Sequence, residues 1–265
     1  MRSAAAAALA GTFLLAPPLT AQETGPIQDN SFLIEEAYNQ EAGVVQHIST
    51  LMLPEDGGDW DFSFTQEWPL GGLRHQLSYT VPVARSGGEE GIGDVAINYR
   101  YQLVGGPEDP IAFAPRFSLL LPTGDEEKGL GSAALGAQVN LPLSVVLTPS
   151  VVGHTNAGFT LVPDAENAAG ETADLDGYFL GQSLIWLLRP RFNLMLEGLW
   201  SRSESVAGPG RAAAEESFFL SPGVRYAQDF PSGLQVVYGL AAPIGVGPSE
   251  DENALFLYLS LEHPF

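Results

Sequence analysis

Cysteine is absent from the sequence of 265 residues, and cations are few, with 11 Lys and Arg against 32 Asp and Glu. Without cysteine the chain cannot form disulfide bonds, so burial and backbone pairing alone must stabilise the fold. The acidic balance excludes nucleic acid as a partner, because proteins bind nucleic acid through clustered cations. Beyond the N-terminus no apolar run reaches the ~18 residues that identify a transmembrane helix. The chain could therefore cross a membrane only with strands that close into a barrel.

The N-terminus has the layout of a secretory signal peptide. Arg2 is followed by the apolar stretch AAAAALAGTFLLA and then by the small residue Ala21, after which we predict cleavage. An ordinary surface helix would need a polar face, and this stretch has none. The chain is therefore predicted to be exported.

From residue 44 onward, segments of about ten residues alternate between apolar and polar side chains. In the segment 93–104, Ile97 and Tyr99 share one face, whereas Asn98 and Arg100 share the other. Twelve such segments are found, at 44–53, 59–68, 73–83, 93–104, 110–121, 132–141, 144–154, 175–187, 190–202, 216–227, 232–243 and 253–265. Short alternating segments separated by turn residues are typical of membrane barrels. The predicted fold is all-β, a transmembrane antiparallel up-and-down β-barrel of about 12 strands.

The connections between these segments differ in length and charge. Short ones such as LPLS, at 141–144, alternate with longer acidic ones such as 155–174, and we predict that the acidic stretches are solvated loops. Outer-membrane barrels have short periplasmic turns and long extracellular loops, and an even strand number places both chain ends in the periplasm.

The chain is accordingly divided into three parts. These are a signal peptide at 1–21, an N-terminal periplasmic segment at 22–43 and an outer-membrane barrel at 44–265. The sequence leaves open whether the segment 22–43 enters the barrel.

The last predicted strand ends on an aromatic residue, Phe265. Leu257, Leu259 and Leu261 share its face, which is therefore predicted to point to lipid. Aromatic side chains form a girdle at each interface of such barrels. We predict that Phe265 completes the periplasmic girdle and acts as the membrane-assembly signal for the barrel-assembly machinery.

Alternation places six charged residues on the inner faces of six strands. These lumen-lining candidates are Glu67, Arg100, Arg116, Glu197, Arg225 and Glu262. A charge within the membrane span is costly unless it faces water or a partner, so such residues are functional candidates. They could line an open pore, or they could pair into a network that fills the interior, as in small barrels. The sequence does not decide between these two interpretations.

The four histidines, His47, His75, His154 and His263, are far apart and lack the spacing of a metal site. We predict no metal site, no cofactor and no catalytic residue. One enzymatic alternative is an outer-membrane esterase or phospholipase, for which His154 with Ser150 or Ser183 is the candidate pair, although no nucleophile motif supports it.

Three stretches and the Phe-terminated last strand resemble a family of bacterial outer-membrane proteins labelled for the meta-pathway of phenol degradation. The stretches are EEAYNQEAGVVQHIS at 35–49, GIGDVAINYRYQL at 91–103 and FSLLLPTGD at 117–125. The resemblance implies a barrel and, through the family label, the passage of small aromatic compounds. It implies no catalytic site.

These features together predict a channel in the cell outer membrane of a Gram-negative-type bacterium. It would take up small molecules passively, including aromatic or hydrophobic compounds, and would contact outer-membrane lipid and lipopolysaccharide. The alternatives are the esterase and a plugged structural barrel without transport.

Overall fold

The computed structural model describes Ile27 and residues 29–265. The predicted signal peptide at 1–21 therefore lies outside the described residues. The strands are β1 (Val44–Pro54), β2 (Trp60–Pro69), β3 (His75–Ser86), β4 (Glu89–Ile92), β5 (Val95–Tyr101), β6 (Ile111–Phe113), β7 (Arg116–Leu121), β8 (Gly136–Asn140), β9 (Leu143–Thr148), β10 (Val151–Glu166), β11 (Thr172–Arg189), β12 (Phe192–Gly208), β13 (Arg211–Asp229), β14 (Gln235–Ala241), β15 (Ile244–Gly245) and β16 (Ala254–Pro264). Two short 3₁₀ helices, η1 (Glu126–Lys128) and η2 (Gly247–Ser249), lie in loops.

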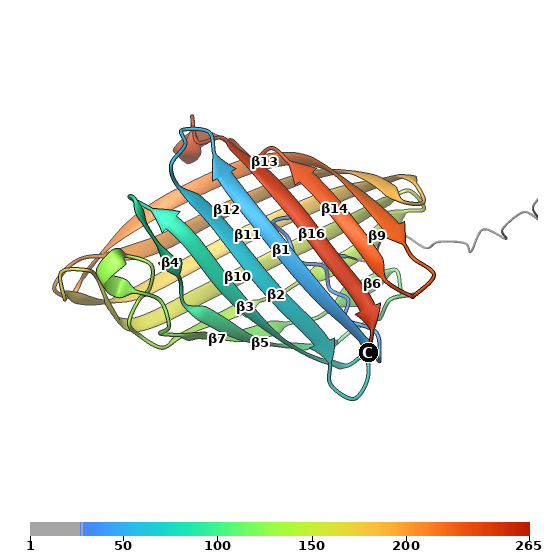
Figure 1. The fold of residues 1–265 in the computed structure, drawn as a ribbon, viewed down its shortest axis with the longest axis horizontal. Coiled ribbons are helices and arrows are strands. Elements are labelled where there is room, and N and C mark those ends of the chain that lie inside the picture. The colour runs from blue at the N-terminus through green and yellow to red at the C-terminus, as the bar shows by residue number, and fades with distance from the viewer. Residues whose placement is uncertain (1–26, 28) are drawn as a thin grey trace, which may run out of the picture.

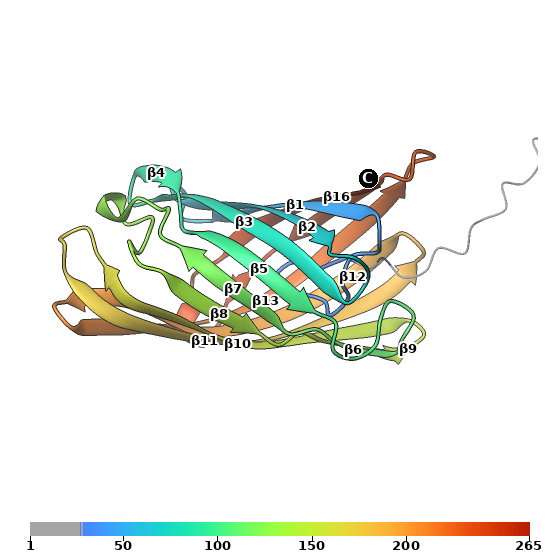
Figure 2. The ribbon, with the colours of Figure 1, turned by 90° about the horizontal axis from the view of Figure 1, so that it is seen from below.

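These elements form a closed antiparallel barrel of twelve strands, which confirms the predicted fold class (Figures 1 and 2). The barrel closes where β1 pairs with β16, in a continuous register from Val44 opposite Pro264 to Pro54 opposite Ala254. Closure satisfies the backbone groups that an open sheet would leave at its edges. No helix in the described part of the chain is long and apolar enough to cross a membrane.

Four of the twelve barrel strands consist of two shorter pieces. These are β4 with β5, β6 with β7, β8 with β9, and β14 with β15. Pro115, Pro142 and Pro243 lie in three of the breaks. Proline has no N–H to donate to the ladder, so the pairing is interrupted at these positions and resumes beyond them.

The predicted sixth and seventh strands, at 132–141 and 144–154, have the wrong boundaries. The pieces β8 and β9 form one barrel strand that pairs with β10, and the chain reverses at Pro149 and Ser150. The stretch LPLS predicts a turn because it contains Pro142. However, the Leu141 N–H bonds to Ala157 and the Pro142 carbonyl to the Ala114 N–H, so the chain stays in the wall. The predicted number of twelve strands is still correct, because both predicted strands are shifted toward the N-terminus relative to the observed ones.

The acidic stretches are also partly strand rather than loop. The strands β10 to β13 are 16 to 19 residues long, and their hairpins project beyond β1 to β3 (Figure 1). The expected loop at 155–174 is reduced to 167–171, because β10 and β11 occupy the rest. Glu215 and Glu216 lie on β13 and are exposed. These acids nonetheless remain at the end of the barrel opposite the C-terminus, here called the long-strand end. The end that carries the C-terminus is called the short-turn end.

The strand faces follow the alternation of the sequence. Leu257, Phe117 and Tyr99 are exposed on the outside, and polar side chains such as Gln46, Asn98 and Ser183 are buried inside. Most of the described part of the predicted periplasmic segment 22–43, namely Ile27 and residues 29–40, lies inside the barrel, where it contacts inward-facing side chains from many strands. This placement differs from a segment that lies below the barrel, and the next section gives its physical cause.

Candidate functional site

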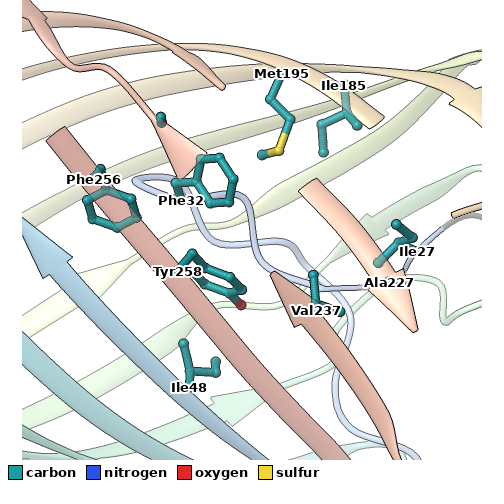
Figure 3. Close-up of a cluster of buried hydrophobic side chains, with 10 residues drawn as sticks. Ile27, Phe32, Ile48, Ile185, Met195, Ala227, Val237, Phe256 and Tyr258 are labelled. Carbon is teal, nitrogen blue, oxygen red and sulfur yellow. The ribbon is translucent and has the colours of Figure 1, made fainter. Parts of the chain in front are cut away.

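The interior of the barrel is occupied by residues 29–40, here called the lumen segment. Most of its residues are buried, yet it contains no helix or strand. Figure 3 shows it as a coil that crosses the interior between the strands. Backbone N–H and C=O groups that are buried without a ladder need other partners. The barrel wall supplies these partners.

Three charged wall residues bind the backbone of the lumen segment and its approach. The Arg225 guanidinium donates hydrogen bonds to the carbonyls of residues 27, 29 and 30 at 2.9, 2.7 and 3.0 Å. The Glu197 carboxylate accepts hydrogen bonds from the N–H groups of residues 32, 33 and 34 at 3.1 to 3.3 Å. Arg100 donates to the carbonyls of residues 36 and 38 at 3.1 and 2.8 Å. Charge-assisted hydrogen bonds of this kind are stronger than neutral ones.

Arg116 and Glu67 form ion pairs around the same segment. Arg116 forms a salt bridge to Glu35 of the lumen segment, with 2.7 Å between Nη2 and Oε1. Glu67 lies 3.7 Å from Arg100 and accepts a hydrogen bond from Gln76. Glu262 lies on β16 opposite Gln46 and Gln235. Of the six lumen-lining candidates, four therefore contact the lumen segment directly. Arg100 also lies close to Glu67 and opposite Arg116 on β7.

Amides and hydroxyls of the wall complete the contacts. Gln102 accepts a hydrogen bond from the Asn39 N–H, Gln76 accepts one from Gln40, and Ser144 accepts one from Ala37. Asn156 accepts from the N–H of Glu35 and donates to its carbonyl. Sequence reasoning did not find these residues, because a neutral polar side chain on an inner face is expected in any water-facing lumen.

Two side chains of the lumen segment occupy sites where the wall has glycine. A Cβ on Gly239 would lie 2.2 Å from Phe32 Cε1, and one on Gly223 would lie 2.6 Å from Cε2. A Cβ on Gly181 would lie 2.0 Å from Ile34. The Phe32 ring also packs against Phe256 and Tyr258, with centroid distances of 5.7 and 5.4 Å (Figure 3). The wall is therefore shaped to this particular segment, since any larger residue at these glycines would displace it.

A cavity of about 400 Å³ lies against the lumen segment on the side of the long-strand end. Phe32, Phe256 and Tyr258 supply an aromatic part of its lining. Hydroxyls supply another part, in cross-strand pairs that join Thr50 to Ser63 at 2.7 Å and Thr65 to Thr80 at 2.9 Å, together with Ser78. The Arg116 to Glu35 ion pair lies in the same lining, as does Glu67, whose carboxylate is 3.7 Å from Arg100, so these four charges balance. A second cavity of only about 40 Å³ lies on the other side of the segment.

Some acidic residues near the long-strand end stabilise loops through hydrogen bonds and an ion pair. Asp94 accepts hydrogen bonds from the backbone N–H of Gly124 and of Ser132, both at 2.9 Å, and so holds the loop 122–135 together. In this loop the Lys128 ammonium lies 2.9 Å from Asp125, and the hydrogen bond from Lys128 holds the pKa of the Asp125 carboxyl below its ordinary value. Most of the remaining acids there are exposed and give the mouth a negative charge.

The residues of the esterase alternative do not form an accessible site. His154 is 2% exposed and faces the interior, where its Nδ1 lies 2.7 Å from the Ser144 hydroxyl. That hydroxyl is also engaged by the Ala37 N–H. Ser183 accepts a hydrogen bond from the Ser31 hydroxyl, and Ser150 lies in a turn. The Ser144 and His154 pair therefore anchors the lumen segment and does not face lipid.

Phe265 and three of the four histidines lie on the outside of the barrel. Phe265 is 73% exposed, and its backbone N–H bonds to the Gly43 carbonyl. His75 bonds to the Tyr99 hydroxyl at 2.6 Å. His47 and His263, separated by 216 positions in sequence, lie side by side on β1 and β16.

Solved structures with a similar fold are bacterial outer-membrane barrels. An outer membrane channel from Pseudomonas putida F1 superposes with a TM-score of 0.66 at 12% identity, covering 86% of this chain and 98% of that one. The NanC porin gives 0.55 at 7% identity, covering 83% and 100%. The translocator domain of the autotransporter NalP from Neisseria meningitidis gives 0.50 at 14% identity, covering 85% and 90%. The fold is thus that of an outer-membrane β-barrel.

The family model described as "Putative MetA-pathway of phenol degradation" matches residues 25–243. The chain belongs to this family, as the sequence resemblance indicated. None of the curated proteins matches the sequence.

Proposed function

We propose that this protein is a passive uptake channel for small amphipathic molecules, including compounds with one aromatic ring and a polar substituent. The observation that carries the proposal is the cavity of about 400 Å³ with an aromatic part and a hydroxyl part in its lining. Cavities that bind small molecules are mostly apolar, have a few well-placed polar groups and enclose roughly 300–1,000 Å³. The family description, which refers to phenol degradation, supports the same class of solute.

The near-neutral lining favours uncharged solutes. Arg116 is paired with Glu35, and Glu67 lies near Arg100, so no excess charge is left to attract an ion into the cavity. The negative mouth repels anions and concentrates cations only near the entrance. A phenolic hydroxyl can bond to Thr and Ser hydroxyls, which act as donor or acceptor, while its ring packs on Phe32 and Phe256.

Passage through the barrel requires the lumen segment to move, because it separates the larger cavity from the short-turn end. Its backbone is bound by side chains rather than by a strand ladder, so its release needs only rotamer changes in the wall and leaves every barrel strand paired. The segment is in this proposal the gate of the channel. Export through a signal peptide at 1–21 and assembly through Phe265 belong to the same proposal.

Swelling of liposomes that contain the purified protein tests the function. We expect faster entry of resorcinol than of xylitol, each corrected for protein-free liposomes, because only resorcinol matches both parts of the lining. Phe256→Ala should reduce the resorcinol rate, and Phe117→Ala, which changes an exposed outer ring, should not.

The outcomes separate the alternatives. Equal rates for the two solutes would contradict the solute class and indicate a general pore. A wild-type protein that admits neither solute, together with a variant lacking residues 29–40 that admits both, would indicate a plugged structural barrel.

A further inference from the structure

The closing seam of the barrel carries a pair of histidines that no strand spacing could predict. His47 lies on β1 opposite Leu261, and His263 lies on β16 opposite Val45, so the two are diagonal neighbours across the first and last strands. Their Nε2 atoms are 3.3 Å apart, and the rings are nearly parallel, with a centroid distance of 5.4 Å and an interplanar angle of 24°. Both rings point to the outside of the barrel at the short-turn end.

The orientation of each ring is fixed by a second contact. His263 Nδ1 lies 2.9 Å from the Pro264 carbonyl, to which it can only donate, so in the neutral ring Nε2 carries the free lone pair. The His47 ring stacks on Phe64 at an interplanar angle of 23°. A histidine that donates Nδ1–H to a backbone carbonyl and presents Nε2 is arranged as metal-binding histidines are.

We propose that His47 and His263 bind one zinc ion between their Nε2 atoms. In tetrahedral zinc sites the Zn–N bond is about 2.0–2.1 Å, which places two histidine nitrogens about 3.3 Å apart. The distance in the structure matches this value without any movement. A square-planar metal would require its neighbouring nitrogens about 2.9 Å apart, so the geometry favours zinc over copper.

The remaining coordination positions are open to the outside of the barrel at the short-turn end, where the membrane–water interface supplies water. Gln66, opposite His47 on β2, accepts a hydrogen bond from Tyr79 and is not free to bind through its oxygen. Among the described residues no group of three or more His, Cys, Asp or Glu side chains is placed to hold a metal. Water therefore completes the tetrahedron, and the site is open. The ion joins β1 to β16, the one strand pair whose partners are distant in sequence, and so acts as a clamp on the barrel seam.

Zinc titration of the detergent-purified protein, produced without a polyhistidine tag, tests the proposal. We expect one saturable site per chain. Because loss of a supporting contact alone lowers metal affinity about 10- to 100-fold, His47→Ala and His263→Ala should each lower it at least about tenfold. His75→Ala is the matched control, since His75 lies at the same end, is exposed, and bonds to Tyr99.

A second measurement uses the wild-type protein and does not depend on whether a variant folds. Zinc should protect His47 and His263, but not His75, from modification by diethyl pyrocarbonate, as mapped by mass spectrometry. Unchanged zinc affinity in His47→Ala, equal protection of all three residues, or the absence of a saturable site would each overturn the proposal. The pair would then be joined only by an N–H···N hydrogen bond.

Discussion

Replacement of Glu197 with alanine should release the lumen segment from the barrel wall. The Glu197 carboxylate is fully buried on β12 and accepts hydrogen bonds from three consecutive backbone N–H groups, at residues 32 to 34. Among the described residues, Glu197 is the only hydrogen-bond acceptor of these three N–H groups. The substitution therefore leaves three buried donors unpaired while every barrel strand keeps its partners.

The expected effect can be worked out from these contacts. Each buried donor left without an acceptor costs about 1–3 kcal/mol. We use the lower value, because removing a buried carboxylate also removes the cost of burying its charge. Three donors then weaken docking of the segment by about 3 kcal/mol, which corresponds to a shift of about 150-fold toward the released state.

Single-channel recording in planar bilayers measures this shift as longer or more frequent open periods. Glu197→Gln, which keeps one acceptor oxygen, should give an intermediate result. The control is Glu204→Ala on the same strand, because Glu204 bonds to Arg202 and Asp176 and not to the lumen segment. A correctly folded Glu197→Ala barrel with wild-type conductance would refute the assignment of the lumen segment as the gate.

Four further outcomes follow from the structure. Gly239→Ala should also raise conductance, because its Cβ would lie 2.2 Å from Phe32, and adding Phe32→Ala should not raise it further if both changes act on the same contact. Deletion of Phe265 should lower the outer-membrane yield, measured by fractionation and heat-modifiable migration, and a normal yield would contradict its role in assembly. Reversal potentials should show a weak cation preference at 0.1 M salt, where charges act over about 10 Å, that fades at 1 M, where they act over about 3 Å. Arg116→Ala should strengthen this preference, because it removes one positive charge from the lumen and leaves Glu35 with only the more distant Arg100. Anion selectivity at low salt would refute the argument from the mouth charge. Hydrolysis of short-chain esters or phospholipids should be absent, and turnover that is lost in His154→Ala would restore the enzymatic alternative.

The barrel wall is largely predictable from the sequence, because the direction of each side chain depends only on its position along its own strand. A strand between lipid and water must alternate, so the faces of residues such as Tyr99 and Asn98 follow from their neighbours alone. Strand boundaries were predicted wrongly where one sequence feature is compatible with two structures. Pro142 predicts a turn, yet it only interrupts one barrel strand. Which of these applies depends on how 141–142 pairs with Ala114 and Ala157 in the neighbouring strands, and this pairing is not visible in the pattern.

The lumen segment could not be predicted for a different reason. Its contacts with Glu197, Arg225 and Arg100 are made by its backbone, and backbone groups are the same in every sequence. Some side chains of the segment also fit particular wall positions, but their spacing produces no period. They are Asp29, Ser31, Phe32, Ile34, Glu35, Asn39 and Gln40. The evidence for this segment in the sequence lies instead in the barrel wall. Charges of both signs occupy its inner faces, and a simple aqueous pore would not need such charges. Charge on an inner face thus indicates a bound partner, and here that partner is the protein's own chain.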